Sequence, residues 1–240
     1  ITENDKDESD YFNDHFLNLS KFGRRELISK NDCSKLYKFV EIETNHLYAG
    51  QMSMIKIRHL SKSDIDQLTY EIGNIMRMNH PCLLKFIGYS PIDFKKQRKP
   101  VIVTEYFSNR SLSDVLEIER NNKFIQGWNE TKKLINIFGI ASGMSYLHSQ
   151  GIIHKSLKTC NIYLDDILTP KLGDFGLSTR FNASESITYQ SISGIKASPI
   201  YSSPEVMQKN EFSKASDVYA FAFIVYEIVC KEIPFKEISN

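Results

Sequence analysis

The chain has 240 residues, 41% of them hydrophobic and 25% charged, and its formal net charge at pH 7 is +1. This length suffices for one large domain or two lobes that each bury a core. The chain lacks the strongly basic balance of many nucleic-acid-binding and lipid-binding proteins, so we expect no such partner. Its four cysteines are widely scattered and form no short-spaced pair of a zinc or redox site, which favours a reducing, cytoplasmic setting.

The beginning of the chain is acidic and poor in apolar side chains. The carboxylates of its first fourteen residues are Glu3, Asp5, Asp7, Glu8, Asp10 and Asp14. Such a segment buries too little apolar surface to offset the entropy of ordering. We therefore expect residues 1–20 to form a flexible acidic leader. Because the chain begins with Ile1 rather than Met, we also expect it to be a piece of a longer protein.

Strand signals come first along the chain. Between Phe22 and about Ile57, stretches such as residues 35–42 alternate in period 2 and contain aromatic and branched side chains, which predicts antiparallel strands. Val101–Val103 predicts a further short, buried strand. Together these segments favour a small sheet.

Helix signals dominate the rest of the chain. Ser63 and Asp64 can cap a helix that extends to Met76. A longer helix is predicted with a core face made of Leu134, Ile137, Phe138, Ala141, Met144 and Leu147. The apolar run 220–230 is interrupted by Glu227 and is shorter than the roughly 20 residues of a membrane span, so it predicts a buried helix. Strands followed by helices indicate an α+β protein with a sheet-rich lobe and a larger helical lobe.

Three motifs occur in a fixed order in the second half of the chain. Residues 154–161 read HKSLKTCN, residues 171–177 read KLGDFGL, and residues 203–205 read SPE. In order and spacing they resemble the signature set of eukaryotic protein kinases. The resemblance runs from about Phe22 to the C-terminus.

This resemblance implies a two-lobed α+β fold. A small antiparallel-sheet lobe with one helix, together with the hinge, would occupy residues 21–106, and a mostly helical lobe would occupy residues 107–240. Family members continue for several helices past the point that Asn240 matches, so we expect the large lobe to be incomplete at its C-terminal end. Lys158 and residues 198–201, SPIY, look most like the serine/threonine type and its tyrosine-kinase-like group.

Four residues match kinase positions that hold nucleotide phosphates and metal. Lys56 stands at the position of the strand lysine and Glu71 at that of its helix partner, a pair that grips the phosphates in the family. Asn161 and Asp174 match the two magnesium ligands, and oxygen ligands are what that ion requires. Binding of ATP and Mg²⁺ therefore stays open on these residues.

Framework positions are also retained. Thr104 matches the gatekeeper, and Glu105 and Phe107 match the hinge that contacts the nucleotide. Asp217 looks like the helix anchor of the loop 154–161. The apolar spine positions of the family are matched by Ile75, Phe86, His154 and Phe175.

The first departure from the family is Ser156, which stands where kinases have the aspartate that deprotonates the incoming hydroxyl. Serine is no general base at neutral pH, and losing a positioned base typically costs about 100- to 10,000-fold in rate. Phosphoryl transfer depends mostly on positioning and electrostatics, so this change alone leaves trace activity open.

The other departures concern nucleotide binding. The segment 28–36 aligns with the glycine-rich loop but contains no glycine, since Ser29, Asn31 and Ser34 replace the three family glycines. Bare backbone approaches phosphate closely, so the side chains favour an ordinary hairpin instead. Met54 and Tyr163 are larger than the residues that flank adenine in the family, and they favour core packing without a ligand.

We therefore predict a pseudokinase that acts in signalling by binding or allosterically controlling protein partners, an active kinase being one candidate. ATP and Mg²⁺ binding is expected to be weak or absent. The alternative is a weakly active, ATP-dependent serine/threonine kinase that uses Lys56, Asp174 and Asn161.

Overall fold

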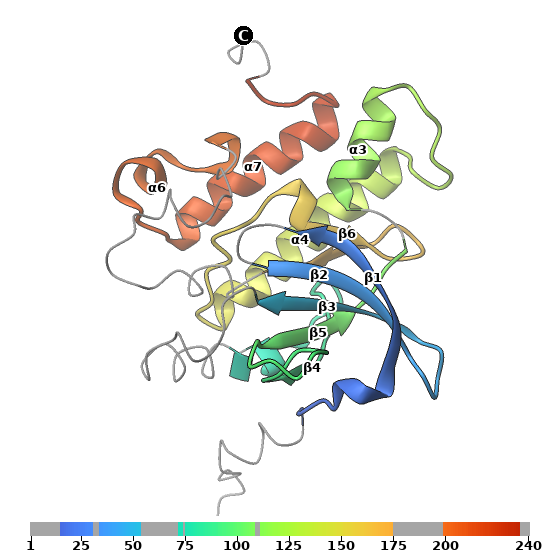
Figure 1. The fold of residues 1–240 in the computed structure, drawn as a ribbon. Coiled ribbons are helices and arrows are strands. Elements are labelled where there is room, and N and C mark those ends of the chain that lie inside the picture. The colour runs from blue at the N-terminus through green and yellow to red at the C-terminus, as the bar shows by residue number, and fades with distance from the viewer. Residues whose placement is uncertain are drawn as a thin grey trace, which may run out of the picture. The chain divides into compact units, whose positions relative to one another are not determined.

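The structure of the chain is a computed structural model that describes residues 15–30, 34–53, 72–73, 75–108, 111–174 and 199–235. These residues divide into two compact units (Figure 1). The first contains the described residues up to Met78 together with Lys85–Tyr106, and the second contains Asn79–Leu84 and the described residues from Phe107 onward. The first is built on a sheet and the second on helices, so the predicted α+β fold class is confirmed.

The first unit is a five-stranded antiparallel sheet in the order β1-β2-β3-β5-β4 (Figure 1). Its strands are Phe22–Lys30 (β1), Ser34–Glu41 (β2), Leu47–Ser53 (β3), Phe86–Ser90 (β4) and Val101–Glu105 (β5). The strands predicted between Phe22 and Ile57 and at Val101–Val103 are thereby confirmed over the described residues. A sheet of five strands with one apolar face can be stable by itself, whereas a pair of strands would be only marginally stable.

An aromatic cluster forms the core of this unit. Phe39 on β2 is fully buried, and the rings of Phe22 and Phe94 pack edge-on against it, with centroids 4.9 and 5.4 Å away. Gly50 on β3 lies under the Phe39 ring, where any side chain would collide with it. Phe94 belongs to the loop between β4 and β5, so this loop is fastened to the sheet by its own aromatic side chain.

The second unit consists mainly of helices. They are Leu112–Arg120 (α3), Glu130–Ser149 (α4), Pro204–Lys209 (α6) and Lys214–Cys230 (α7), with a hairpin of Ile162–Leu164 (β6) and Pro170–Leu172 (β7). Ser111 and Ser213 begin α3 and α7 with capping boxes. In each box the serine side chain accepts from the backbone N–H three residues later, and the side chain of that later residue accepts from the N–H of the serine. The predicted long helix is confirmed as α4.

The predicted core face of α4 is wrong in part. Met144 and Leu147 are buried, but Leu134 and Phe138 are 56% and 73% exposed. Lys133, Asn136, Ile140 and Gly143 complete the buried positions. The polar members can turn inward because each finds a partner. Lys133 Nζ lies 2.7 Å from a Glu119 carboxylate oxygen, and Asn136 Nδ2 donates to the Leu168 carbonyl at 2.9 Å. Such pairing offsets part of the desolvation penalty, although the Asn136 Oδ1 atom has no hydrogen-bond partner among the described residues.

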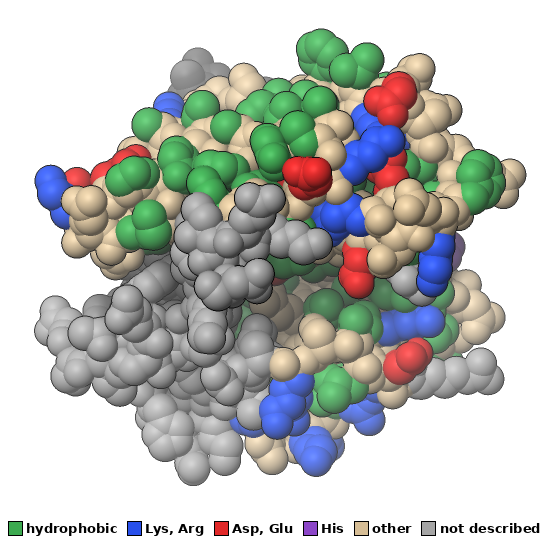
Figure 2. Space-filling view, turned by 90° about the horizontal axis from the view of Figure 1, so that it is seen from above, with side chains coloured by type: hydrophobic (Ala, Val, Ile, Leu, Met, Phe, Trp, Pro, Cys, Tyr) green, Lys and Arg blue, Asp and Glu red, His purple; other side chains and the backbone are tan. Residues whose placement is uncertain are grey.

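The run 220–230 is helical as predicted, but only one face of α7 is buried. Ala220, Ile224 and Ile228 are inside, whereas Val218 and Val229 are exposed. Figure 2 shows hydrophobic side chains gathered on the face that carries this helix. Within the described ranges, no helix is both long and apolar enough to cross a membrane.

Several predicted features lie outside the described residues. These are most of the leader, residues 31–33 of the loop aligned with the phosphate loop, and the side chains of Met54, Lys56, Glu71 and Phe175. Of the helix predicted over 63–76, the described residues 72–73 and 75–76 are helical. The proximity of Lys56 and Glu71 therefore stays a prediction.

Candidate functional site

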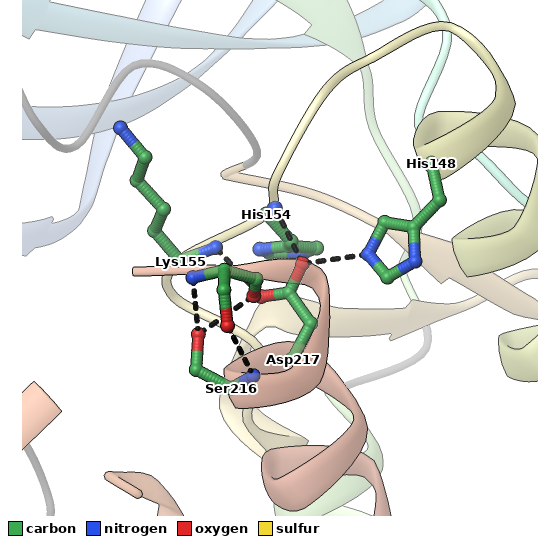
Figure 3. A network of polar contacts seen from close by, with 6 residues as sticks. His148, His154, Lys155, Ser216 and Asp217 are labelled. Atoms are coloured by element: carbon green, nitrogen blue, oxygen red, sulfur yellow. Dashed lines mark hydrogen bonds and ion pairs between the residues drawn. The ribbon is translucent and has the colours of Figure 1, made fainter. Parts of the chain in front are cut away.

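A single buried carboxylate organises the beginning of the 154–161 loop. Asp217, 2% exposed, accepts hydrogen bonds from the backbone N–H of His154 at 2.8 Å and of Lys155 at 2.9 Å (Figure 3). His148, in the last turn of α4, places its Nε2 2.9 Å from the same carboxylate. Asp217 therefore anchors the loop, as the resemblance implied, and joins it to two helices.

The local sequence explains why Asp217 is available at this place. Ser213 caps α7 by accepting from the Ser216 N–H, and Ser216 Oγ accepts from the Ser213 N–H in return. Asp217 follows in the first helical turn, where a carboxylate also interacts favourably with the helix dipole. Lys155 has φ +65°, a left-handed conformation that is unfavourable for a residue with a side chain, and the hydrogen bond from its N–H to Asp217 helps to hold it.

His154 has a packing role. Its side chain is fully buried, in keeping with the spine position that the resemblance assigned to it. Burial lowers the pKa of His154 to about 4, although the charge of Asp217 acts in the opposite direction. The imidazole is therefore neutral at physiological pH and does not supply a positive charge to the loop.

Ser156 and Asn161 contact each other directly. Asn161 Nδ2 donates to the Ser156 carbonyl at 2.8 Å and to the Ser156 Oγ at 2.9 Å. The amide nitrogen is thus committed to the loop, which leaves the amide oxygen as the atom of Asn161 that can bind a ligand. That oxygen accepts a weak hydrogen bond from the Cys160 thiol at 3.7 Å. Position 156 offers a hydroxyl where a carboxylate would be needed to take a proton.

The β6–β7 hairpin brings Asn161 and Asp174 to the same end. Ile162 pairs with Leu172, and the Gly173 N–H donates to the Asn161 carbonyl at 2.9 Å. Asp174 follows at once, with φ +56°. Asn161 and Asp174 are thirteen positions apart in the sequence, and the hairpin makes them neighbours.

The oxygen atoms at this end suit a hard divalent cation. Mg²⁺ is usually held by one or two protein side chains together with water and phosphate oxygens. Asn161 and Asp174 fit such a partial ligand set. Among the described residues, no group of three or more histidine, cysteine and acidic side chains could hold a metal by itself. A cation here would depend on oxygens from a bound phosphate.

Charge and burial act in opposite directions at Asp174. Burial raises the pKa of the Asp174 carboxyl, and the positive charge of Lys158 partly offsets this. The Asp174 charge, followed by burial, holds the pKa of the Tyr163 phenol well above its usual range. Tyr163 is consequently a neutral ring next to a carboxylate.

Tyr163 also explains the glycine at position 173. A Cβ added to Gly173 would lie 2.7 Å from Tyr163 Cε2, which is closer than real carbon contacts allow. The ring therefore packs on bare backbone directly before Asp174. Whether Tyr163 and Met54 fill an adenine slot stays a prediction.

The three hinge candidates have local partners. In the first unit, Thr104 Oγ1 donates to the Glu105 carbonyl at 3.2 Å, and a Glu105 carboxylate oxygen accepts from the Lys85 N–H at 2.8 Å. In the second unit, Lys171 Nζ lies 5.8 Å from the ring centre of Phe107. The Glu105 carboxylate therefore binds backbone at the start of β4, whereas the Phe107 contact joins two side chains.

Sequence reasoning missed a second buried carboxylate that supports the loop. Glu227 on α7 is 3% exposed and accepts a short hydrogen bond from the Tyr201 hydroxyl. The same hydroxyl lies 2.9 Å from Thr159 Oγ1, and Arg120 approaches Glu227 at 3.4 Å. Burial raises the pKa of Glu227, while Tyr201 and Arg120 lower it. The only signal in the sequence was a glutamate inside an apolar run, which is how buried, paired carboxylates often look.

Comparisons with known proteins bear on these observations. A family model described as "Protein kinase domain" matches residues 24–240. The chain is 30% identical over 217 residues to the serine/threonine-protein kinase polo of Drosophila melanogaster, covering 90% of this chain and 35% of the relative. It is 29% identical over 226 residues to the L-type lectin-domain containing receptor kinase V.9 of Arabidopsis thaliana, covering 93% and 32%. The chain thus spans about a third of the length of these relatives.

Proposed function

Because the chain belongs to the protein kinase family, we propose that it is a pseudokinase: a kinase-fold signalling domain that binds or allosterically controls protein partners and transfers phosphate poorly or not at all. An active kinase is one candidate partner. We place it in the serine/threonine type and the tyrosine-kinase-like group on the strength of Lys158 and the segment SPIY, and in the cytoplasm on its cysteine usage.

The observation that carries this proposal is the hydroxyl at position 156. Ser156 Oγ is a hydrogen-bond partner of Asn161, at 2.9 Å, and carries no charge at neutral pH. The incoming hydroxyl of a substrate would find no carboxylate on this side chain to accept its proton. Because Asp217 anchors the backbone of His154 and Lys155, the beginning of the loop is held without a carboxylate at position 156.

Weak nucleotide binding is the second part of the proposal. The family glycines that approach phosphate are replaced by Ser29, Asn31 and Ser34. Tyr163 places a large neutral ring against Gly173, and Met54 is larger than the family residue at its position. Each change replaces space or bare backbone with a side chain. A nucleotide would have to displace these side chains in order to bind.

One observation favours the alternative, a weakly active serine/threonine kinase. Asn161 and Asp174 lie at the same end of the β6–β7 hairpin, and their oxygens fit a cation that phosphate also coordinates. With Lys56 on the phosphates, they would form the electrostatic part of a phosphoryl-transfer site.

Nucleotide binding tests the proposal most directly. Thermal unfolding of the full-length protein should be the same with and without saturating ATP and Mg²⁺. A true binder at 100 times its dissociation constant gains about 2.7 kcal/mol. Lys56→Ala is the matched control, since it removes the phosphate-binding charge. A rise of the melting temperature in the wild type that Lys56→Ala abolishes would support the alternative.

Restoring the base tests the chemistry. We expect Ser156→Asp to show no measurable transfer of radiolabelled phosphate to a generic basic protein. If the base were the only defect, a carboxylate should recover about 100- to 10,000-fold in rate. A nucleotide held weakly or out of line leaves such a base nothing to act on. Opening the nucleotide site with Met54→Ala, Tyr163→Leu and glycines at positions 29, 31 and 34 should matter more.

Ser156→Asn is the matched control for that assay, because it has nearly the size of aspartate and no basic oxygen. Robust transfer by Ser156→Asp that is absent from Ser156→Asn would show a working nucleotide site and favour the active kinase.

A further inference from the structure

The loop between β4 and β5 carries a concentrated positive charge that the net charge of the chain conceals. Four of its five residues 95–99 are basic, namely Lys95, Lys96, Arg98 and Lys99. We call these four side chains the basic turn. All but Lys99 are exposed, and Lys99 is half-buried.

The basic turn is held in one conformation by the two residues before it. Asp93, 5% exposed, accepts hydrogen bonds from the N–H groups of Lys95 and Gln97, both at 2.8 Å. Phe94 packs its ring on the buried Phe39. One residue therefore satisfies the backbone of the turn and the other fastens it to the sheet.

The charges of the basic turn are not neutralised by the described part of the chain. Asp93 is the nearest carboxylate in sequence, and one of its oxygens is occupied by two backbone N–H groups. Over the described residues, no carboxylate lies within ion-pair distance of the four basic side chains. Arg25 adds a further positive charge nearby, since its guanidinium lies 4.4 Å from the centre of the Phe94 ring. Like charges so close together repel one another, and the binding of a segment of opposite charge reduces this repulsion.

The chain itself contains a segment of opposite charge. Residues 1–14 hold six carboxylates and one lysine, a formal charge of −5. No other stretch of the printed sequence has so many acidic residues in so short a length. Its charge is opposite in sign to that of the basic turn and similar in size, since the four basic side chains carry a formal charge of +4.

The segment joins the sheet beside β4, the strand that leads into the basic turn. Leu17 N–H donates to the Tyr89 carbonyl at 2.8 Å, and Tyr89 N–H donates to the His15 carbonyl at 2.9 Å. Residues 15–17 thus run parallel to the last residues of β4, so His15 lies towards the beginning of this strand, whereas the loop follows its end at Ser90. The five residues of β4 span about 17 Å. Fourteen residues reach at most about 46 to 50 Å when fully extended. This reach is well over twice the length of β4, so the segment can return along the strand to the loop, and a tether so short keeps the effective concentration of the segment in the millimolar range.

We propose that the basic turn is a docking surface for an acidic peptide segment, and that residues 1–14 of this same chain occupy it. The contact covers the positive charge of the first unit by intramolecular pairing. Any external anionic partner must first displace the segment. Because the charges are exposed, the contact weakens as salt shortens the Debye length from about 30 Å at 10 mM to about 3 Å at 1 M.

Zero-length carbodiimide cross-linking of the full-length protein, followed by mass spectrometry, tests this proposal. The reagent joins a lysine to a carboxylate only when they are in contact. We expect cross-links between Lys96 and the carboxylates of residues 1–14 at 10 mM salt, and their loss at 1 M salt. A mixture of isotope-labelled and unlabelled protein distinguishes links within one molecule from links between two.

Charge variants make the test specific. Lys95→Gln, Arg98→Gln and Lys99→Gln together keep Lys96 as the reporter, and we expect its cross-link yield to fall about fivefold, the size expected for three exposed ion pairs. The matched control removes three exposed charges of the second unit, with Lys123→Gln, Lys209→Gln and Lys214→Gln, and should leave the yield unchanged.

Three outcomes would overturn the proposal. The Lys96 yield could fall equally in both triple variants, which would indicate a general charge effect. The cross-links could spread evenly over all exposed lysines. They could also join labelled to unlabelled molecules, which would assign the acidic segment to a neighbouring copy.

Discussion

The two ends of the 154–161 loop are held by different kinds of interaction. At the beginning, the buried charge of Asp217 binds the backbone of His154 and Lys155. At the other end, Asn161 is held by the uncharged Ser156, and its own carbonyl is bound by Gly173. The difference teaches that the anchoring of the beginning of the loop does not depend on the side chain at position 156. The chemical group could therefore be replaced while the fold was kept.

Removing the Asp217 carboxylate, which anchors the beginning of the loop, should have the largest effect on the stability of the protein. Asp217→Ala leaves two backbone N–H groups without an acceptor in a buried place, each costing about 1 to 3 kcal/mol. We expect the free energy of unfolding to fall by about 2 to 5 kcal/mol in urea titrations. Asp166→Ala, an exposed carboxylate in the turn of the β6–β7 hairpin, should change it by less than about 0.5 kcal/mol. Equal effects of the two substitutions would contradict the anchoring role.

Adding a side chain at position 173, beside the Asn161 end of the loop, should lower the stability moderately. In Gly173→Ala the new Cβ would collide with the Tyr163 ring, and overpacking of this kind costs about 1 to 3 kcal/mol. Adding Tyr163→Leu should relieve the collision. The double-mutant cycle, measured by urea unfolding, should therefore show a coupling of about 0.5 to 3 kcal/mol. Strictly additive effects would mean that the ring moves aside freely and does not fix the backbone before Asp174.

The smallest expected effect is a pH dependence at the second buried carboxylate. Burial raises the pKa of Glu227 above the 4.5 of a free glutamate, so the folded state binds this proton more tightly than the unfolded state. Its stabilising contribution is complete below about pH 4.5 and is lost as the pH rises through the raised value. Glu227→Gln removes this dependence and can still accept from Tyr201.

Thermal melts of the wild type and Glu227→Gln between pH 4 and pH 7 check this sign. The melting temperature of the wild type should decline relative to that of the variant as the pH increases. The exposed Glu211→Gln is the control. A difference between wild type and Glu227→Gln that stays constant with pH would show that Arg120 and Tyr201 compensate fully for burial.

Much of the fold followed from local patterns. Alternating residues predicted the strands around Phe39, and helical spacing predicted α4, because side-chain direction repeats with period 2 in strands and 3.6 in helices. The helix α7 was predicted from its apolar run, which is too short to span a membrane. The motif residues Asn161 and Asp174 were also found from the sequence. Their neighbourhood, however, results from the Ile162–Leu172 pairing and the Gly173 hydrogen bond.

Errors arose where a polar side chain found a buried partner. Lys133 and Asn136 turn inward on α4 because Glu119 and the Leu168 carbonyl satisfy them, and Leu134 and Phe138 are left outside. An apolar pattern records which side chains avoid water but contains no information on which polar groups will be paired. Glu227 was overlooked for the same reason, since its partners come from segments far away in the sequence.

The sequence by itself determined the order of strands and helices, the positions of the motifs and the absence of a carboxylate at position 156. Only the tertiary structure decided that Asp217 anchors the loop, that Tyr163 packs on Gly173, and that Asp93 and Phe94 fasten the basic turn. The physical reason is that composition and periodicity are sums over the chain, whereas hydrogen bonds, close packing and local charge depend on which distant residues become neighbours.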